Sequence, residues 1–277
     1  MSLEKPNKVQ ELSTKPIILK LGGSVITRKE KSLTANLRAI RRLASEISSA
    51  EVAPLVVVHG GGSFGHPLAK RYAIKEGYKN KVSQALGFAL THQAMIALNK
   101  LVVDTLIEHK LPAVAMSPSS CVVTKSGRIQ TMMEEPLKKL LHKGFVPVLY
   151  GDAVLDSDLG FTILSGDQLI AYLAMCLNAE RIIVGIDVDG LYTADPKTNS
   201  SARLVSHITL KELKSMQQKI EEAKVTDVTG GMLGKVTELK PAIEKGINAL
   251  IVNAAKPKNV YKALKGEKVI GTLIEKG

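Results

Sequence analysis

Three glycine clusters carry the residues best suited to chemistry on phosphate groups. They are Gly22-Gly23-Ser24, the segment 60–65 (GGGSFG), and Gly230-Gly231 followed by Gly234. Glycine lets the backbone approach a ligand closely, and successive N–H groups at the start of a helix can donate to phosphate oxygens. One glycine pair can equally serve a tight turn, but three clusters with a lysine or histidine nearby indicate phosphate binding.

Four charged side chains near these clusters could neutralise or order phosphate charge. Lys20 stands inside an apolar strand, where a lysine is expensive to bury unless it meets a negative charge or snorkels to the surface. Lys29 follows the first turn and Lys235 follows the last cluster, and each on its own would be a solvated surface charge. Asp167 stands at a helix start, where it could cap the helix or hold two lysines in position.

Two nucleotide-binding motifs are excluded by the residues around the glycines. The segment 60–65 matches the dinucleotide fingerprint G-x-G-x-x-G, but no acidic residue ends a second strand about 20 positions later. The segment 229–236 resembles a Walker A loop, but Thr229 and Val236 stand where the first glycine and the magnesium-binding hydroxyl are needed. Neither an NAD site nor a P-loop is expected.

Short apolar strands alternate with helices, and glycine clusters follow two of the strands. Strands are predicted at 17–21, 55–59, 113–116, 145–150, 182–186 and 249–253. Helices are predicted at 37–47 with Thr34 as N-cap, 82–108, 167–177, 210–222 with a Thr209–Glu212 capping box, and 237–245, and hairpins at 119–127 and 154–164. This alternation predicts an α/β fold: a three-layer αβα sandwich with an open, mainly parallel central sheet. Ligands of such folds bind at the carboxyl ends of the strands.

Composition bounds the class of protein. The chain has 277 residues, of which 45% are hydrophobic and 23% charged, and no Pro/Ser-rich linker divides it. These values predict one continuous domain over residues 1–277 with a solvated extension at residues 1–15. The formal net charge of +12 indicates an anionic partner, but only 4% of residues are aromatic and no recognised nucleic-acid module occurs. A nucleic-acid partner is therefore not expected.

The location is predicted from the cysteines and the apolar runs. Cys121 and Cys176 lie far apart without a CxxC pair, which indicates a reducing compartment. The polar residues at the start of the sequence contain no signal peptide, and the uninterrupted apolar runs are too short to span a bilayer. We therefore expect a soluble cytoplasmic protein without a membrane partner.

Five motifs, in this order, resemble the amino acid kinase superfamily. They lie within residues 20–24, 59–66, 165–167, 187–197 and 227–235, and the similarity spans residues 17–252. The resemblance implies the fold of that superfamily, with a phosphate-acceptor lobe at about 16–160 and an ATP-binding lobe at about 161–277. Segment 59–66, together with Tyr150-Gly151-Asp152, most resembles isopentenyl phosphate kinases. That group implies transfer of a phosphoryl group from ATP, with Mg²⁺, to isopentenyl phosphate, in a homodimer.

The resemblance also implies residue roles. The catalytic set would be Lys20, Lys29, His66, Asp167 and Lys235. ATP would be bound by Lys20, Gly22, Gly23, Ser24, Gly62, Asp187, Tyr192, Lys197, Gly231 and Lys235. The acceptor phosphate would be bound by Gly61, Gly62, His66 and Gly151, and its tail by Leu68, Phe88, Ala153 and Ile163. No protein metal ligands are implied, because Mg²⁺ would bridge the ATP phosphates.

His66 favours an acceptor that carries a phosphate. A phosphate monoester is already ionised at pH 7, so it needs no general base but only a donor that orients it, such as a partly charged histidine. Fosfomycin kinases share the histidine-containing loop and remain an alternative, as does another small-phosphate kinase of the superfamily. A uridylate kinase would need residues that read uracil and ribose, and none is identified. The basic charge leaves a nucleotide- or nucleic-acid-binding regulator open, although Lys20, Asp167 and Lys235 together favour an enzyme.

Overall fold

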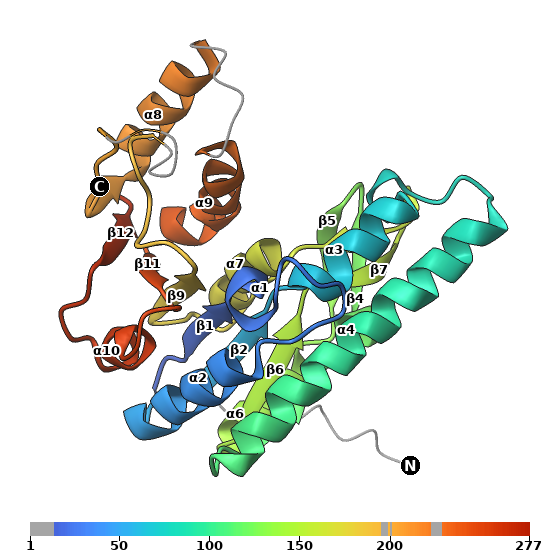
Figure 1. Ribbon diagram of the computed structural model, residues 1–277, viewed down its shortest axis with the longest axis horizontal. Helices are drawn as coiled ribbons and strands as arrows, with labels where there is room; N and C mark the ends of the chain where they lie inside the picture. The colour runs from blue at the N-terminus through green and yellow to red at the C-terminus, as the bar shows by residue number, and fades with distance from the viewer. Residues whose placement is uncertain (1–13, 195–198, 200, 223–228) are drawn as a thin grey trace, which may run out of the picture.

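An eight-stranded sheet runs through the centre of the protein (Figure 1). The computed structural model describes residues 14–194, 199, 201–222 and 229–277. The strand order is β10-β12-β11-β9-β1-β2-β6-β3, and every neighbouring pair is parallel except β11 with β12. The strands are β1 (Ile17–Leu21), β2 (Leu55–His59), β3 (Ala113–Ala115), β6 (Val146–Tyr150), β9 (Arg181–Ile186), β10 (His207–Thr209), β11 (Asn248–Asn253) and β12 (Gly271–Glu275). The predicted α/β class with a mainly parallel sheet is confirmed.

Helices cover both faces of this sheet, which gives the three layers that the sequence predicts. One face packs against α2 (Leu37–Ala50), α4 (Val82–Glu108) and α10 (Asn259–Lys265). The opposite face packs against α6 (Glu135–His142), α7 (Gly166–Cys176), α8 (Leu210–Glu222) and α9 (Thr229–Glu244). Four short helices lie in the connections: α1 (Gly23–Ile26), α3 (Gly62–Arg71), η1 (Ile74–Glu76) and α5 (Pro118–Cys121).

The alternation of side chains along β1 explains why a lysine is buried in it. Successive side chains of a strand point to opposite faces, so Ile17 and Leu19 pack against the α2–α4–α10 layer. Ile18 packs on the other face, and Lys20 shares its parity. Lys20 therefore points toward α7, whose first turn carries Asp167.

A smaller four-stranded sheet, ordered β5-β4-β7-β8, lies beside the central one. Its strands are β4 (Val122–Lys125), β5 (Arg128–Met132), β7 (Asp152–Asp156) and β8 (Gly160–Leu164). The hairpin predicted at 154–164 is confirmed, while the one predicted at 119–127 was wrong in its bounds. Residues 118–121 form α5, because Pro118 suits the first turn of a helix, and the hairpin instead turns at Ser126-Gly127.

The helix termini show which capping predictions hold. Glu212 accepts a hydrogen bond from the Thr209 N–H and donates its own N–H to the Thr209 hydroxyl, so the predicted capping box is confirmed. Thr34 as N-cap of α2 was wrong: Asn36, directly before the helix, accepts from the Ala39 N–H at 3.3 Å. Helix α9 begins at Thr229, eight residues earlier than predicted.

Helix α4 is long and apolar enough to span a membrane by length and composition. The prediction that the apolar runs are too short to span a bilayer was made for uninterrupted runs. In α4 the apolar residues are interrupted by polar side chains that are buried and hydrogen-bonded inside the protein. Gln84 donates to the Gly77 carbonyl, Thr91 to the Gly87 carbonyl, and Asn99 meets the ring of His59. A core helix meets the same criteria, and α4 packs against the central sheet.

Asp156 ties the two hairpins of the small sheet together. Its buried carboxylate accepts hydrogen bonds from the Thr124 hydroxyl and from the backbone N–H groups of Ser126, Gly127, Asp158 and Leu159, at 2.8–3.1 Å. Burial raises the pKa of Asp156, but these hydrogen bonds outweigh it and lower the pKa to about 2.

Replacement of Asp156 by alanine is expected to lower the free energy of unfolding by about 3 kcal/mol, because buried N–H groups lose a charged acceptor. Since the folded pKa lies below the unfolded value of about 3.9, this stabilisation is present above pH 4 and is lost as the pH falls toward 2. Urea unfolding between pH 2 and pH 7 measures both effects. Asp158→Ala removes an exposed carboxylate bonded to the Ser126 hydroxyl and should change little; an equal loss in both variants would contradict the assignment.

Candidate functional site

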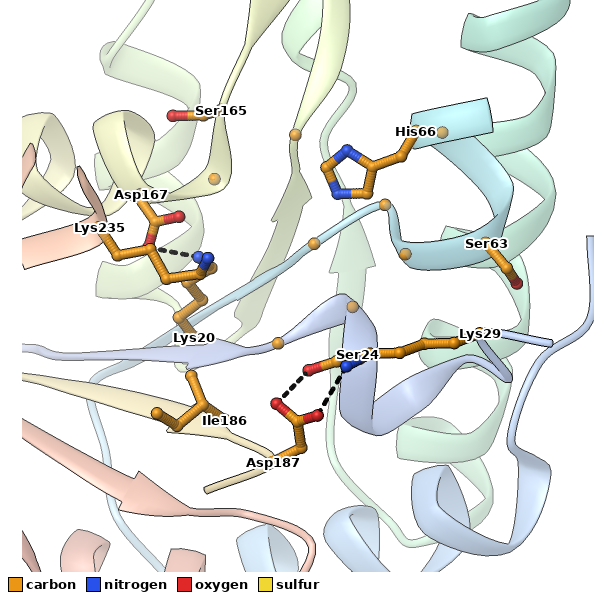
Figure 2. A pocket seen from close by; sticks show the side chains of 18 of the residues that line it. Lys20, Ser24, Lys29, Ser63, His66, Ser165, Asp167, Ile186, Asp187 and Lys235 are labelled. Carbon is orange, nitrogen blue, oxygen red and sulfur yellow. Dashed lines mark hydrogen bonds and ion pairs between the residues drawn. The ribbon is translucent and has the colours of Figure 1, made fainter. Parts of the chain in front are cut away.

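The glycine turns meet at the carboxyl edge of the central sheet, where they line a cavity of about 640 Å³. Strands β1, β2, β6 and β9 all end there, and the residues that follow them face the same space. The cavity brings together fourteen of the residues predicted from sequence: Lys20, Gly22, Gly23, Ser24, Lys29, Gly61, Gly62, His66, Gly151, Ile163, Asp167, Asp187, Tyr192 and Lys235. Figure 2 shows His66 on one side of it and Lys20, Asp167 and Lys235 on the other.

Some predicted residues are placed elsewhere. Ala153 is fully buried and packs with Ile74 and Phe161. Phe88 packs against the same cluster. Ala153 and Phe88 therefore lie behind the cavity wall rather than in its lining. Leu68 packs on the α2–α4 core. Lys197 lies outside the described residues, and Gly231 falls in the first turns of α9. The tail contacts expected of Phe88, Ala153 and Leu68 could therefore only be indirect.

The apolar part of the cavity includes residues that sequence reasoning missed. Pro67 and Ala69 come from α3, and Thr91 and Met95 come from the middle of α4. Thr91 and Met95 are four residues apart, so they lie one turn apart on the same face of the helix. This spacing was the feature of the sequence that could have identified them as a pair. Which face of α4 meets the glycine turns depends on tertiary packing.

Lys20 forms a buried ion pair with Asp167. The side chains are 5% and 13% exposed, and the ammonium group donates directly to the carboxylate. Burial lowers the pKa of Lys20, and the charge of Asp167 opposes that effect. Asp167 lies one residue after the start of α7, and the N-cap is Ser165, whose hydroxyl accepts from the Gln168 N–H. Asp167 therefore does not cap the helix but holds Lys20, which is one of the two lysines that the sequence analysis offered as its partners.

Asp187, which follows β9, joins two elements of the cavity mouth. Its carboxylate accepts a hydrogen bond from the Ser24 hydroxyl at 2.9 Å and forms an ion pair with Lys29 Nζ at 2.9 Å (Figure 2). Burial raises the pKa of Asp187, but these two contacts outweigh it and lower the pKa. The Lys29 side chain is 58% exposed, so its ammonium group can exchange this partner for a phosphate oxygen.

The two glycine turns cross in direct backbone contact. A Cβ on Gly23 would lie 2.3 Å from the Gly62 nitrogen, and one on Gly60 would lie 2.8 Å from the Gly23 nitrogen. Gly62 itself has a φ of +48°. Glycine is therefore required by the close approach and not only by the turns.

The crossing leaves four backbone donors at the cavity. In the part of the chain that the structure describes, no acceptor bonds the N–H groups of Gly23, Ser24, Gly61 and Gly62. The N–H of Gly22 is taken by the Gly185 carbonyl, and that of Gly151 by the His59 carbonyl, at 2.7 and 3.1 Å. Gly151 thus forms part of the cavity wall and does not offer its N–H to a phosphate. The four N–H groups at the crossing, in contrast, can donate hydrogen bonds to anionic oxygens.

His66 and His59 behave differently although they flank the same turn. The side chain of His66 is exposed to the cavity, where partial desolvation and then the charges of Lys235 and Lys20 lower its pKa. Both effects oppose the partial positive charge that the sequence analysis assigns to His66. His59 is fully buried, meets Asn99 at 3.1 Å and has a pKa lowered by burial to about 4, so it is a core residue, as expected.

A second buried acid, Asp152, also borders the cavity. His92 on α4 contacts both of its carboxylate oxygens at 3.0 and 3.1 Å. Burial raises the pKa of Asp152 to about 6, and His92 opposes the shift. Sequence reasoning used Asp152 only as part of a motif and missed His92, since the two residues lie 60 positions apart.

Acidic residues for a metal ion are few at this site. Among the described residues, no group of three or more His, Cys, Asp or Glu side chains is arranged to hold an ion. Asp187 faces the cavity mouth with a half-buried carboxylate, while Asp167 is engaged by Lys20. This donor set fits a cation that reaches the site bound to phosphates, since Mg²⁺ uses one or two carboxylates together with substrate phosphates.

The arrangement can bind two phosphate-bearing molecules at once. Cations and backbone donors line both sides of the crossing, and the cavity continues from there into an apolar region beside α4. Among the described residues, the two carboxylates nearest the crossing, Asp167 and Asp187, are paired with lysines and so are not free to act as a general base. Such a site fits phosphoryl transfer, which depends on positioning and charge neutralisation.

Comparison with known proteins agrees with this geometry. The model of the amino acid kinase family matches residues 15–253. The chain is 46% identical over 265 residues to the isopentenyl phosphate kinase of Methanothermobacter thermautotrophicus, covering 93% of this chain and 98% of that protein. It is 34% identical over 267 residues to the isopentenyl phosphate kinase of Methanocaldococcus jannaschii, with 93% and 98% covered. A solved isopentenyl phosphate kinase structure is 43% identical, with a TM-score of 0.83 over 94% of this chain and 99% of that one.

Proposed function

The chain belongs to the amino acid kinase family, and we propose that it transfers the γ-phosphoryl group of ATP to isopentenyl phosphate, giving ADP and isopentenyl diphosphate. The observation that carries this reading is one cavity in which a cationic, glycine-lined region continues into apolar walls made by Pro67, Ala69, Met95 and Ile163. Such a cavity matches a phosphate on a short apolar chain. The identity to two isopentenyl phosphate kinases supports the same acceptor.

The two substrates are assigned to different parts of the chain. The acceptor phosphate lies against Gly61, Gly62 and His66, within residues 16–160, and its tail extends toward Met95 and Ile163. ATP lies against the part from residue 161 onward, where Asp187, Tyr192 and Lys235 line the cavity, and its phosphates reach Gly23 and Ser24 on β1's turn. Residues 1–277 then act as one domain with the reaction at the junction of its two lobes.

The protein contributes position and charge to this reaction. Lys20, held by Asp167, and Lys235 neutralise the charge that builds on the transferred group. Lys29 leaves Asp187 to contact the transferred phosphoryl or the acceptor phosphate. The N–H groups of the two glycine turns orient the reacting oxygens from both sides. The acceptor phosphate itself is the nucleophile and is already ionised, so no proton has to be removed.

Mg²⁺ is the expected companion of ATP. Mg²⁺ would supply charge neutralisation and orientation. Of the described side chains, Asp187 is placed to face it at the cavity mouth, and Lys29 and Ser24 are the partners from which Asp187 would then be released. Chelation of Mg²⁺ by EDTA should stop turnover, and turnover that continues would contradict this part of the proposal.

Two copies of the chain associate, we propose, through an exposed apolar stripe on α4. Val82, Leu86, Leu90 and Ile96 are 87%, 56%, 38% and 37% exposed, and the first three follow one another at four-residue spacing on one face of the helix. Such a stripe is typical of a self-association surface. Light scattering after size-exclusion chromatography should give twice the mass of the 29.8 kDa chain, and Leu86→Glu should halve it. A monomeric native protein would overturn the homodimer.

The cytoplasm is the proposed location. Cys121 and Cys176 are free, half-buried thiols, which fits a reducing compartment. ATP is also available there. Cell fractionation with a cytosolic marker tests the location, and enrichment with membranes or in a secreted fraction would contradict it.

The reaction is tested by ADP release from purified protein with Mg-ATP and a panel of acceptors. The panel contains isopentenyl phosphate, dimethylallyl phosphate, fosfomycin, UMP, N-acetylglutamate and glutamate. Turnover confined to the two prenyl monophosphates is the expected result. Turnover with another acceptor alone would leave the fold and the lysines in place but overturn the assignment of the apolar region.

Replacement of His66 by glutamine is expected to raise KM for isopentenyl phosphate about tenfold, since a hydrogen bond to a charged group contributes about 1.5–3 kcal/mol. KM for ATP should stay within about twofold, because His66 lies across the cavity from Lys235. Steady-state kinetics with each substrate varied in turn measures both values. His142→Gln, at an exposed histidine on α6, is the matched control. Equal rises in both KM values would contradict the role.

A further inference from the structure

One buried hydroxyl joins the two glycine turns. Thr27 Oγ1 donates to the Gly23 carbonyl at 2.7 Å and accepts a hydrogen bond from the Ser63 N–H at 3.0 Å. Gly23 lies at the start of α1, in the turn that follows β1, and Ser63 lies in the first turn of α3, after β2. The hydroxyl thus acts as a donor to one turn and as an acceptor from the other, and so connects the two.

The connection is enclosed and leaves little room for alternatives. Thr27 is 3% exposed and Ser63 is 6% exposed, so water does not replace either bond. The backbone N–H of Thr27 donates to the same Gly23 carbonyl at 3.0 Å. A Cβ on Gly62 would lie 2.1 Å from Thr27 Oγ1 and 2.9 Å from its methyl group, so the hydroxyl fits only against a glycine.

The two turns that Thr27 connects serve different substrates in the proposed reaction. Gly23 and Ser24 present their free N–H groups to the phosphates of ATP, and Gly61 and Gly62 present theirs to the acceptor phosphate. Thr27 also begins the loop that carries Lys29, and it is fixed there by a β-bridge to Ala35. Its hydroxyl therefore lies between the donor and acceptor sides of the site without lining the cavity.

We propose that Thr27 is a positioning residue that sets the separation of the two phosphate-binding turns, an inference that rests on the proposed function. In direct phosphoryl transfer the attacking and leaving oxygens must be in line and close, and a misplacement of about 1 Å costs on the order of 100-fold in rate. Each turn can still bind its own anion after a small shift. The alignment between the two bound anions is what such a shift loses.

The test compares three substitutions at this position. Thr27→Val keeps the branched shape and removes both hydrogen bonds, Thr27→Ser keeps the hydroxyl, and Thr27→Ala removes both the bonds and the methyl group. Thr27→Val is expected to lower kcat between tenfold and about 100-fold, with both KM values within about threefold, while Thr27→Ser stays within about threefold of the native kcat. Thr105→Val is the control, because Thr105 is also buried and donates to the Leu101 carbonyl inside α4.

Two further measurements separate positioning from a loss of folding. Thermal unfolding gives the folded fraction, and titration calorimetry gives the affinity for ATP and for isopentenyl phosphate separately. Unchanged affinities with a lowered kcat in Thr27→Val, rescued by Thr27→Ser, support the proposal. A native kcat in Thr27→Val, a loss equal to that in Thr105→Val, or a loss that follows the unfolded fraction would overturn it.

The proposed function can be wrong while the positioning role of Thr27 still holds. If the native protein uses another acceptor from the panel, the same ratio of kcat between Thr27→Val and Thr27→Ser is measured with that acceptor. A ratio near one overturns the positioning role whichever acceptor is used. Inactivity of the native protein with isopentenyl phosphate overturns the acceptor assignment alone.

Discussion

Lys20→Met is expected to lower kcat by at least about 100-fold, in the range that follows loss of a preorganised charge at a transition state. Lys20 is buried on β1, one of the two middle strands of the sheet, and its ammonium group faces the cavity beside Asp167. Methionine matches the length of the side chain and suits an apolar strand, so it removes the charge with little change of shape. Because the charge acts most strongly on the transferring group, KM for ATP should change by less than a few-fold.

Lys20→Met also leaves the Asp167 carboxylate buried without its partner, which destabilises the fold. The double variant Lys20→Met/Asp167→Asn removes the carboxylate charge as well. A lowered kcat in this variant can then be attributed to the lost ammonium group rather than to a destabilised fold. Lys100→Met, at an exposed lysine paired with Asp104 on α4, is the matched control. Steady-state kinetics and thermal unfolding of all three decide the point. A large rise in KM for ATP with a native kcat would show that Lys20 binds ATP without stabilising the transition state.

Gly62→Ala is expected to reduce kcat/KM for the acceptor below about 1% of native, because the turn cannot keep its position. A Cβ at this residue would lie 2.6 Å from the Gly23 carbonyl oxygen and still closer to the Thr27 hydroxyl. The φ of +48° adds about 1–2 kcal/mol of backbone strain for any residue with a Cβ. The steric overlap pushes the two glycine turns apart, and the strain destabilises the backbone conformation of Gly62.

The matched control is Gly144→Ala, which introduces the same type of backbone strain in open space. Gly144 has a φ of +78°, and nothing lies within 4 Å of a Cβ built there. Kinetics and thermal unfolding of both variants separate strain from steric overlap. If Gly144→Ala lowers the melting temperature as much as Gly62→Ala does, and the activity of folded Gly62→Ala is native, the close crossing has no role in catalysis.

The sequence predicted the parts of the site that depend on short-range patterns. The apolar runs ending in glycine were recognisable as buried strands, and parallel strands place their carboxyl ends at one edge. The structure adds the parity of β1, which places Lys20 on the face that α7 covers. For these residues, local pattern and the family resemblance led to the same arrangement.

The parts that the sequence did not predict depend on contacts between distant segments. Helices α6 and α10 and strands β10 and β12 are short and are positioned by packing on the sheet rather than by their own periodicity. Phe88 and Ala153 have apolar side chains suited to a tail pocket, yet Tyr72, Phe161 and Ile74 enclose them in a neighbouring cluster. The lowered pKa of His66 was not predicted because it depends on partial burial in the folded protein and on the charges of Lys235 and Lys20, which come from opposite ends of the chain.

The position of β1 has a consequence for how the enzyme loses activity. Every residue of β1 is buried, and the strand pairs along its whole length with β2 on one side and β9 on the other. Amide groups in such a strand open to exchange with solvent only when the whole domain unfolds. The groups that align the two substrates are therefore attached to a segment whose amides we expect to exchange slowly. Local opening elsewhere can admit or release ligands, but inactivation by heat or denaturant should coincide with global unfolding.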